Sequence, residues 1–183
     1  MLFEQRCFTL KDGRKAVLRL PDPERDAAAM VKYLTDTAAE TEFVLRYPEE
    51  CGRYTVESER AFLEGFNANP NSLFLTCFVG EQLAGNCELQ FNTQIKYRHK
   101  ASVAVALYRK FWGQGIGSAM FRAMEEVARQ RGVMFMELEY IGGNQRGRGL
   151  YEKMGFVEVA VHPDAVMLKD GSTRSLVYMM KKL

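Results

Sequence analysis

The chain has 183 residues, of which 47% are hydrophobic and 26% charged, a balance that is typical of a folded globular protein and excludes a disordered one. Its length fits one domain, residues 1–183, with a single hydrophobic core. The 25 basic and 23 acidic residues are scattered and give a formal charge of +2, so they form no basic stripe and argue against a nucleic-acid partner.

The sequence offers neither a metal site nor a membrane segment. The four cysteines show no CxxC spacing, and two histidines are too few to complete a metal site with them. We therefore expect four free thiols, at Cys7, Cys51, Cys77 and Cys87. No run approaches the ~20 apolar residues of a membrane span, and the start MLFEQRCF lacks the features of an export signal. These features predict a cytoplasmic protein without membrane contact.

The N-terminal third predicts a hairpin followed by two helices. Apolar strands at 7–10 and 16–20 flank an Asp-Gly turn. The first helix begins at Pro23, after Asp22 as N-cap, because proline favours the first helical turn. A second helix begins near Thr55. Its predicted buried face consists of Phe62, Leu63 and Phe66.

The rest of the chain predicts strands interrupted by two helices. Strands at 73–79, 82–91 and 101–107 form an antiparallel meander. A glycine-rich turn then leads into a helix that Gly132 ends. A strand at 134–141 follows, with Met134, Met136, Leu138 and Tyr140 on one face. A short helix near 145–154 and two final strands, 157–161 and 173–180, complete an α/β (α+β) fold in the order ββαα, βββ, α, β, α, ββ.

The glycine-rich turn lies in LYRKFWGQGIGS, residues 107–118, where a strand passes into a helix. The unpaired N–H groups and the positive end of the helix dipole at such a position suit a pyrophosphate, and glycine lets the backbone approach the phosphate oxygens. The turn has neither the GK[ST] of a nucleotide P-loop nor the GxGxxG spacing of a dinucleotide site. Taken alone, it is explained equally well as a tight bend.

A second motif makes the interpretation specific. WGQGIGSAMF is followed some thirty residues later by Asn144 and then LYEKMGF, residues 150–156. This pair resembles the acetyl-CoA-binding motifs of the GNAT superfamily of N-acetyltransferases, in particular the branch that acetylates ribosomal-protein N-termini and small amines. The resemblance implies a mixed, mostly antiparallel sheet flanked by helices. It also implies that the sheet splays apart between 101–107 and 134–141, with the pantetheine arm in the gap.

The resemblance further implies which residues bind the cofactor, acetyl-CoA. Backbone groups of Val105, Ala106 and Leu107 hold the pantetheine arm, and Asn144 forms a hydrogen bond with the arm. The pyrophosphate binds the amides of Gly113, Gln114, Gly115, Ile116, Gly117 and Ser118.

Three positions depart from the family pattern. Trp112 stands where Arg or Gln is common, so Arg109 or Lys110 is left to supply a charge. Gly147 and Gly149 replace alanines and weaken the short helix by roughly 1 kcal/mol each.

Two residues are candidates for catalysis. Tyr151 occupies the place of the tyrosine that protonates the leaving thiolate in similar members, and Glu139 matches a glutamate base in relatives that act on protein N-termini. A base is required because a lysine-like ammonium, with a pKa near ~10.4, must lose a proton before it attacks a thioester. Glu88, on the preceding strand, is the alternative base. A backbone N–H of 105–107 would stabilise the oxyanion. Without the motif, Tyr151 reads as a core residue and Glu139 as a solvated one.

The sequence does not identify the acceptor, which is an amine of either a small molecule or a protein. In the family, residues 35–59 line the acceptor pocket, and here they hold seven acids against two arginines, which favours a cationic amine. A solvated surface with acids at helix starts explains the same pattern. Polyamines, N-terminal amines, lysine side chains, aminoglycosides and amino acids all remain candidates. A non-catalytic acyl-CoA sensor or interaction module, binding of another phosphate ligand, and a homodimer also remain open.

Overall fold

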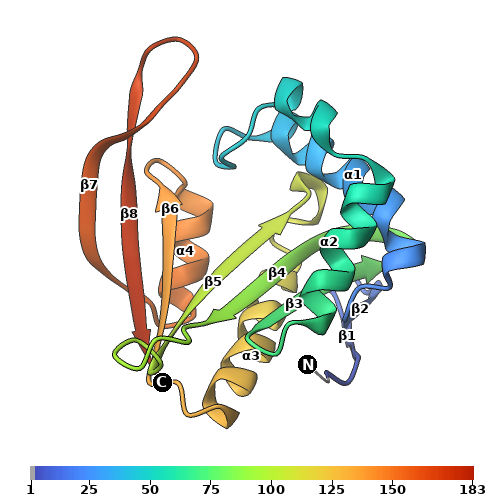
Figure 1. The fold of residues 1–183 in the computed structure, drawn as a ribbon. Helices are drawn as coiled ribbons and strands as arrows, with labels where there is room; N and C mark the ends of the chain where they lie inside the picture. The colour runs from blue at the N-terminus through green and yellow to red at the C-terminus, as the bar shows by residue number, and fades with distance from the viewer. Residues whose placement is uncertain (1–2) are drawn as a thin grey trace.

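Residues 3–183, the part of the chain that the structure describes, form an eight-stranded sheet in the order β1-β2-β3-β4-β5-β6-β8-β7, shown as a computed structural model in Figure 1. The elements in chain order are β1 (Arg6–Thr9), β2 (Lys15–Arg19), α1 (Pro23–Glu40), the 3₁₀ helix η1 (Pro48–Arg53), α2 (Val56–Ala68), β3 (Ser72–Val79), β4 (Gln82–Phe91), β5 (Lys100–Leu107), η2 (Arg109–Phe111), α3 (Ile116–Gln130), β6 (Phe135–Ile141), α4 (Gln145–Lys153), β7 (Val157–Met167) and β8 (Thr173–Lys182). The predicted element order and fold class are confirmed.

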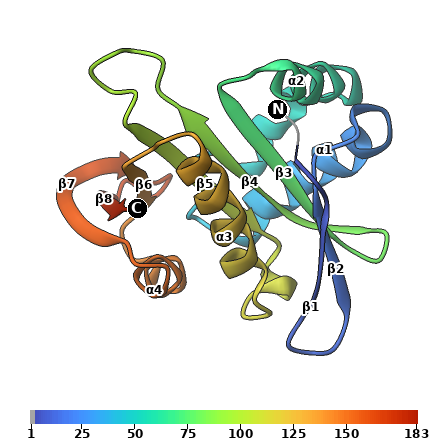
Figure 2. The same cartoon turned by 90° about the horizontal axis from the view of Figure 1, so that it is seen from below.

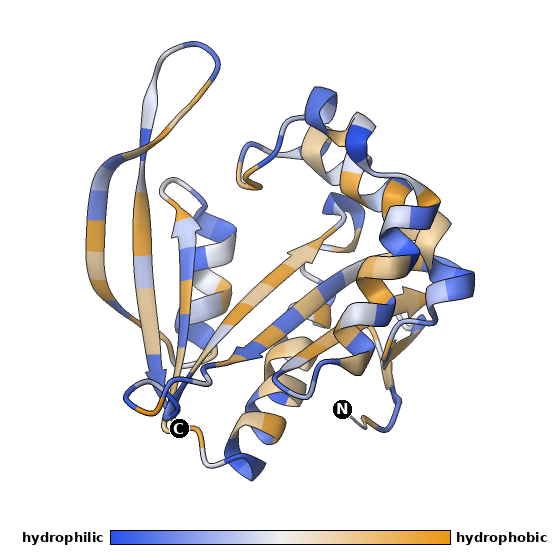
Figure 3. Ribbon diagram, viewed as in Figure 1, coloured by the Kyte–Doolittle hydropathy of each residue, from blue (hydrophilic) through white to orange (hydrophobic). Residues whose placement is uncertain are grey.

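Local sequence signals explain the helix boundaries. The side chain of Asp22 accepts hydrogen bonds from the first amides of α1, and that of Thr55 accepts one from α2, so both helices begin where the N-caps predict. Gly132, with φ of 70°, follows the end of α3. Figure 2 shows α1 and α2 on one side of the sheet and α3 on the other. Hydrophobic and hydrophilic residues alternate along α1 and α2, as the colours in Figure 3 show.

Two details of the predicted helix and strand faces are wrong. Leu63 is fully buried, but Phe62 is 44% exposed because it lies at the rim of the contact between α2 and β3. Met136, Leu138 and Tyr140 share the buried face of β6 as predicted, whereas Met134 precedes the strand and is 51% exposed. In both cases the run of apolar residues in the sequence extends beyond the residues that are buried against the sheet.

The sheet opens between β5 and β6, as expected from the family resemblance. These two strands run parallel and pair only at Lys100↔Phe135, Ala101↔Met136 and Ser102↔Glu137. Beyond Ser102 they diverge, while β4 stays paired to β5 as far as Leu107 and β8 stays paired to β6 as far as Ile141 (Figure 1). The inner edge of β5 beyond Ser102 therefore faces a gap instead of a neighbouring strand.

The C-terminal hairpin is longer than the sequence predicts. β7 extends to Met167, and β8 lies between β6 and β7. None of the helices in residues 3–183 is both long and apolar enough to cross a membrane.

Candidate functional site

Two cavities meet in the gap between β5 and β6. The smaller, of about 330 Å³, extends along the glycine-rich turn and α4, and the larger, of about 810 Å³, lies over β4, β5, β6 and β8. Four residues line both cavities: Phe43, Val105, Asn144 and Tyr151. A group bound at this junction would contact ligands in both cavities.

The glycine-rich turn forms one wall of the smaller cavity. Gly115 is the N-cap of α3, with φ of 98°, and Gly113 has φ of 75°, a backbone conformation that favours glycine. No side chain caps α3, and the N–H groups of residues 113–118 donate no hydrogen bond to any residue that the structure describes. Six backbone donors at the positive end of a helix are therefore available for an anion, which fits a pyrophosphate.

The turn is fixed from two sides. The indole Nε1 of Trp112 donates a hydrogen bond to the carbonyl oxygen of Leu107 at 3.0 Å, which joins the turn to the end of β5. The amide of Lys11 donates to the carbonyl oxygen of Gln114 at 3.3 Å, which joins it to the β1–β2 turn. Of the predicted cofactor residues, Gln114 alone does not line the smaller cavity, and its side-chain Oε1 is buried without a hydrogen-bond partner among residues 3–183.

Among the described residues, the smaller cavity is lined by no carboxylate and by three cationic side chains: Lys11, Arg146 and Lys153. The expectation that Arg109 or Lys110 supplies the charge is not supported, because neither lines the cavity and both lie over aromatic rings of the 108–112 segment. Arg146 and Lys153 fall inside the second motif and could have been inferred from it. Lys11 has no such local signal, because only the tertiary contact with Gln114 brings it here.

Asn144 starts α4 and lies at the junction. Its Oδ1 accepts a hydrogen bond from the amide of Gly147 at 2.9 Å, so its Nδ2 is the group left to donate to a ligand. A Cβ at Gly147 would lie 2.7 Å from this Nδ2, whereas a Cβ at Gly149 would meet nothing within 4 Å. At position 147 a side chain would therefore clash with Asn144, which explains the glycine. At position 149 the structure offers no steric explanation for a glycine that weakens the helix.

Tyr151 lies on α4 with its ring between two other aromatic rings. The centroid distance is 5.8 Å to Phe121 and 5.5 Å to Tyr140. Burial raises the pKa of Tyr151 to about 12, with a smaller contribution from Tyr140. Its hydroxyl makes no hydrogen bond within residues 3–183. Tyr151 is therefore a protonated donor at neutral pH, packed in place by its ring and without a protein acceptor for its proton.

The larger cavity is lined by carboxylates from two strands: Glu88, Glu137 and Glu139. Glu88 lies opposite Ala104, and Ser102 opposite Glu137, so these side chains share one face of the sheet. The Nζ of Lys100 lies 2.5 Å from Oε1 of Glu137 and offsets that charge. Burial raises the pKa of the Glu88 carboxyl above its usual range, while Glu139 is exposed and has no ion-pair partner in the described part of the chain.

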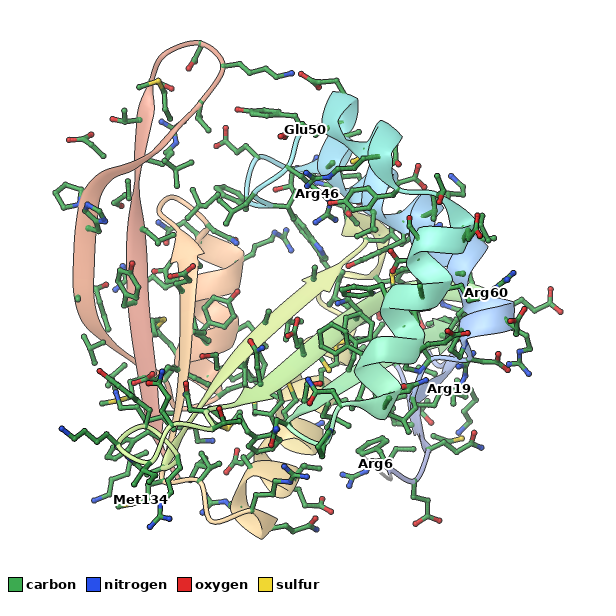
Figure 4. The ribbon with its side chains drawn as sticks, viewed as in Figure 1. Arg6, Arg19, Arg46, Glu50, Arg60 and Met134 are labelled. Carbon is green, nitrogen blue, oxygen red and sulfur yellow. The ribbon has the colours of Figure 1, made fainter. Side chains whose placement is uncertain are left out.

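The seven acids of residues 35–59 do not line the larger cavity, so the predicted reason for a cationic acceptor is wrong. These acids make contacts outside the cavity: Glu40 accepts from the amide of Arg109, and Glu50 accepts from the amide of Tyr47 at 2.7 Å. The segment between α1 and η1 is held against α1 by Arg46, whose Nε donates to the carbonyl oxygen of Leu34 at 3.1 Å. Figure 4 shows the side chains of Arg46 and Glu50 in this part of the molecule. What residues 35–59 contribute to the larger cavity is apolar, namely Phe43 and Leu45.

The cysteines are free, as predicted. Burial raises the pKa of Cys77 to about 12 and that of Cys87 further, so both are neutral core thiols and not nucleophiles. In residues 3–183, no group of three or more His, Cys, Asp or Glu side chains could hold a metal ion.

Comparison with known proteins agrees with this geometry. Residues 29–156 match the acetyltransferase (GNAT) family. Over 50 residues the chain is 48% identical to a mycothiol acetyltransferase of Beutenbergia cavernae; this match covers 27% of the chain and spans only 17% of the length of that relative.

Solved structures resemble nearly the whole chain. An acetyltransferase of the GNAT family from Streptococcus pneumoniae superimposes with a TM-score of 0.83 at 24% identity, covering 92% of this chain and 99% of that one. YncA from Salmonella typhimurium, solved with its cofactor acetyl-CoA, gives a TM-score of 0.76 at 18% identity, covering 92% of this chain and 94% of the other. The chain therefore belongs to the acetyltransferase (GNAT) family, in which acetyl-CoA is the usual acyl donor.

Proposed function

We propose that this protein is an acetyl-CoA-dependent N-acetyltransferase that transfers the acetyl group directly to a primary amine. One observation carries the proposal: a cavity lined by cations and a cavity lined by carboxylates meet at Asn144 and Tyr151. The first suits a donor that bears phosphates, and the second suits an acceptor that bears an ammonium. Acyl transfer between the two would take place where the cavities join.

The residues of the smaller cavity fit coenzyme A. The amides of residues 113–118 would bind its pyrophosphate, and Lys11, Arg146 and Lys153 would add positive charge around it. The unpaired inner edge of β5 at Val105, Ala106 and Leu107 offers backbone groups to the pantetheine arm. When bound, acetyl-CoA supplies the thioester carbon that the amine attacks.

The protein's own groups would take one proton from the ammonium and donate a hydrogen bond to the leaving thiolate, and the second proton lost from the nitrogen would pass to solvent. A carboxylate of the larger cavity would take a proton from the ammonium, so that the neutral amine can form the new C–N bond. Glu139 is our candidate from the resemblance, and the raised pKa of Glu88 makes it a stronger base at the same face. As the C–S bond breaks, the hydroxyl of Tyr151 would donate a hydrogen bond to the leaving sulfur. No covalent enzyme intermediate is needed.

The proposal is tested in two steps. The shift in melting temperature is first compared for acetyl-CoA, ATP and NAD; we expect stabilisation by acetyl-CoA, since a ligand of the native state raises its stability. Release of free thiol is then measured over a panel of amines. Stabilisation by ATP or NAD instead would overturn the assignment of the donor. Acetyl-CoA binding without thiol release on any amine would identify a sensor.

A further inference from the structure

We propose that the acceptor is an aliphatic amine that carries at least two positive charges and no anionic group. This inference rests on the proposed function, because it assumes that the larger cavity receives the acceptor. It goes beyond that function by selecting one chemical class among primary amines, from the charges and the walls of the cavity.

The charge of the larger cavity has one sign. Lys100 offsets Glu137 at 2.5 Å, which leaves Glu88 and Glu139 without a cationic partner. No lysine, arginine or histidine lines this cavity in the part of the chain that the structure describes. An acceptor carboxylate or phosphate would thus lose water without gaining a counter-charge and would face carboxylates of like charge. Free amino acids are disfavoured on this ground.

The two uncompensated carboxylates call for two cations at different places. Glu88 lies on β4 and Glu139 on β6, with β5 between them. Adjacent strands lie about 4.8 Å apart, so the two strands are separated by at least about 10 Å, and the sheet has already splayed at this level. Two carboxylates on strands this far apart are neutralised more fully by two cations than by one ammonium. A diamine places one nitrogen near each of them.

The remaining walls are largely apolar. β7 and β8 contribute Val159, Ala160, Leu176 and Met180, and the connection after α1 contributes Phe43 and Leu45. Methylene groups between two ammonium groups would bury against such walls, as the stems of lysine side chains do in proteins. A sugar ring with many hydroxyl groups would instead lose hydrogen bonds to water there. The walls therefore favour an alkyl chain over an aminoglycoside.

The cavity is also bounded at its rim. The tip of the β7–β8 hairpin contacts the connection that contains η1: Lys169 pairs with Glu49 and its amide donates to the hydroxyl of Tyr47 at 3.1 Å. Arg174 lies 3.7 Å from Glu42 in the same two segments. These contacts narrow the side of the cavity between the hairpin and the connection, which suits a slender acceptor better than a folded protein surface. This arrangement favours a small-molecule acceptor.

A matched set of amines tests the inference. Cadaverine, lysine and pentylamine share a five-carbon amine; lysine adds a carboxylate and pentylamine lacks the second nitrogen. Binding to the protein saturated with coenzyme A is measured by calorimetry, and kcat/KM is measured with acetyl-CoA. We expect cadaverine to exceed lysine and pentylamine by at least ~10-fold in both measurements. Lysinamide, which lacks the anion, is expected to approach cadaverine.

A charge introduced into the cavity gives an independent test. Gln90 lines the larger cavity on β4, and Gln82 is exposed on the same strand outside both cavities. Gln90→Lys is expected to shift the cadaverine-to-lysine ratio toward lysine by ~10-fold, because it supplies a partner for the carboxylate. Gln82→Lys, the control, is expected to leave the ratio unchanged.

Several outcomes would overturn this inference. Binding of lysine or pentylamine equal to that of cadaverine would do so, as would a neutral peptide amide that outperforms all of them. Absence of amine binding to a protein that binds coenzyme A would also contradict it. Failure to bind acetyl-CoA at all would instead contradict the proposed function, so the two failures are distinguishable.

Discussion

Replacement of Tyr151 by phenylalanine separates its chemical role from its packing role. The ring contacts with Phe121 and Tyr140, at 5.8 and 5.5 Å, persist in Tyr151→Phe. The hydroxyl makes no hydrogen bond in residues 3–183, so its removal leaves no buried partner unsatisfied. We therefore expect the melting temperature and the affinity for acetyl-CoA to stay nearly unchanged, while kcat falls.

The size of the loss follows from the pKa of Tyr151. Burial raises that pKa to about 12, whereas a free thiol has a pKa of about 8.5. A free tyrosine, with a pKa of about 10, is already a weaker acid than a thiol, so complete proton transfer from Tyr151 to the thiolate is uphill. The hydroxyl acts instead as a hydrogen-bond donor to the developing thiolate. Such a bond to a charged group contributes about 1.5–3 kcal/mol, which corresponds to a loss of between ~10-fold and ~10²-fold in kcat.

The assay is steady-state thiol release with saturating acetyl-CoA, together with cofactor affinity and melting temperature on the same preparation. Tyr97→Phe is the control, because Tyr97 is exposed in the β4–β5 loop and lines neither cavity. Since a pKa of about 12 keeps the hydroxyl protonated through pH 7–10, the ratio of kcat between wild type and Tyr151→Phe is expected to be constant over that range. Full kcat in the variant would refute the role of Tyr151.

Three further predictions concern the cofactor turn, the base and Gly149. Gly115→Glu places an acid and a strained backbone, with φ of 98°, at the start of α3, and is expected to abolish the thermal shift with acetyl-CoA; an unchanged shift would locate the phosphate site elsewhere. If Glu139 is the base, Glu139→Gln lowers turnover at neutral pH and recovers in part at alkaline pH; this behaviour in Glu88→Gln instead would assign the base to β4. Gly149→Ala, with open space around its Cβ, is expected to raise the free energy of unfolding by roughly 1 kcal/mol.

The raised pKa of Glu88 also gives the sign of a stability effect. The native carboxyl keeps its proton to higher pH than the unfolded one, whose ordinary value is 4.5. Ionisation of Glu88 therefore lowers stability as the pH rises above 4.5. The Glu88→Gln variant named above should accordingly melt at a higher temperature than wild type at pH 7.5. The difference should shrink toward pH 4, and a constant difference would contradict the shift.

Local signals in the sequence were sufficient for the elements and for the cofactor turn. The N-caps Asp22 and Thr55, Gly132 after α3 and the glycines of residues 113–117 act through their own backbone and nearest neighbours, so their effects can be predicted from order in the chain alone. The family motif then placed Asn144 and Tyr151 beside that turn. Both line the smaller cavity in the structure.

The charged residues that line each cavity were harder to predict, because a charged side chain interacts with the groups near it in space and not only with its neighbours in the chain. The acids of residues 35–59 contact groups outside the cavity, as Glu50 does at Tyr47 and Glu40 at the amide of Arg109, and the charge of the larger cavity comes from Glu88, Glu137 and Glu139 on β4 and β6. Lys11 reaches the smaller cavity from the β1–β2 turn. The sequence by itself determined the order of elements and the glycine turn, since these depend on neighbours in the chain, and the family resemblance proposed Asn144 and Tyr151 as site residues. Only the tertiary structure decided which charges face each cavity, because strand pairing and the splay after Ser102 bring together residues far apart in sequence.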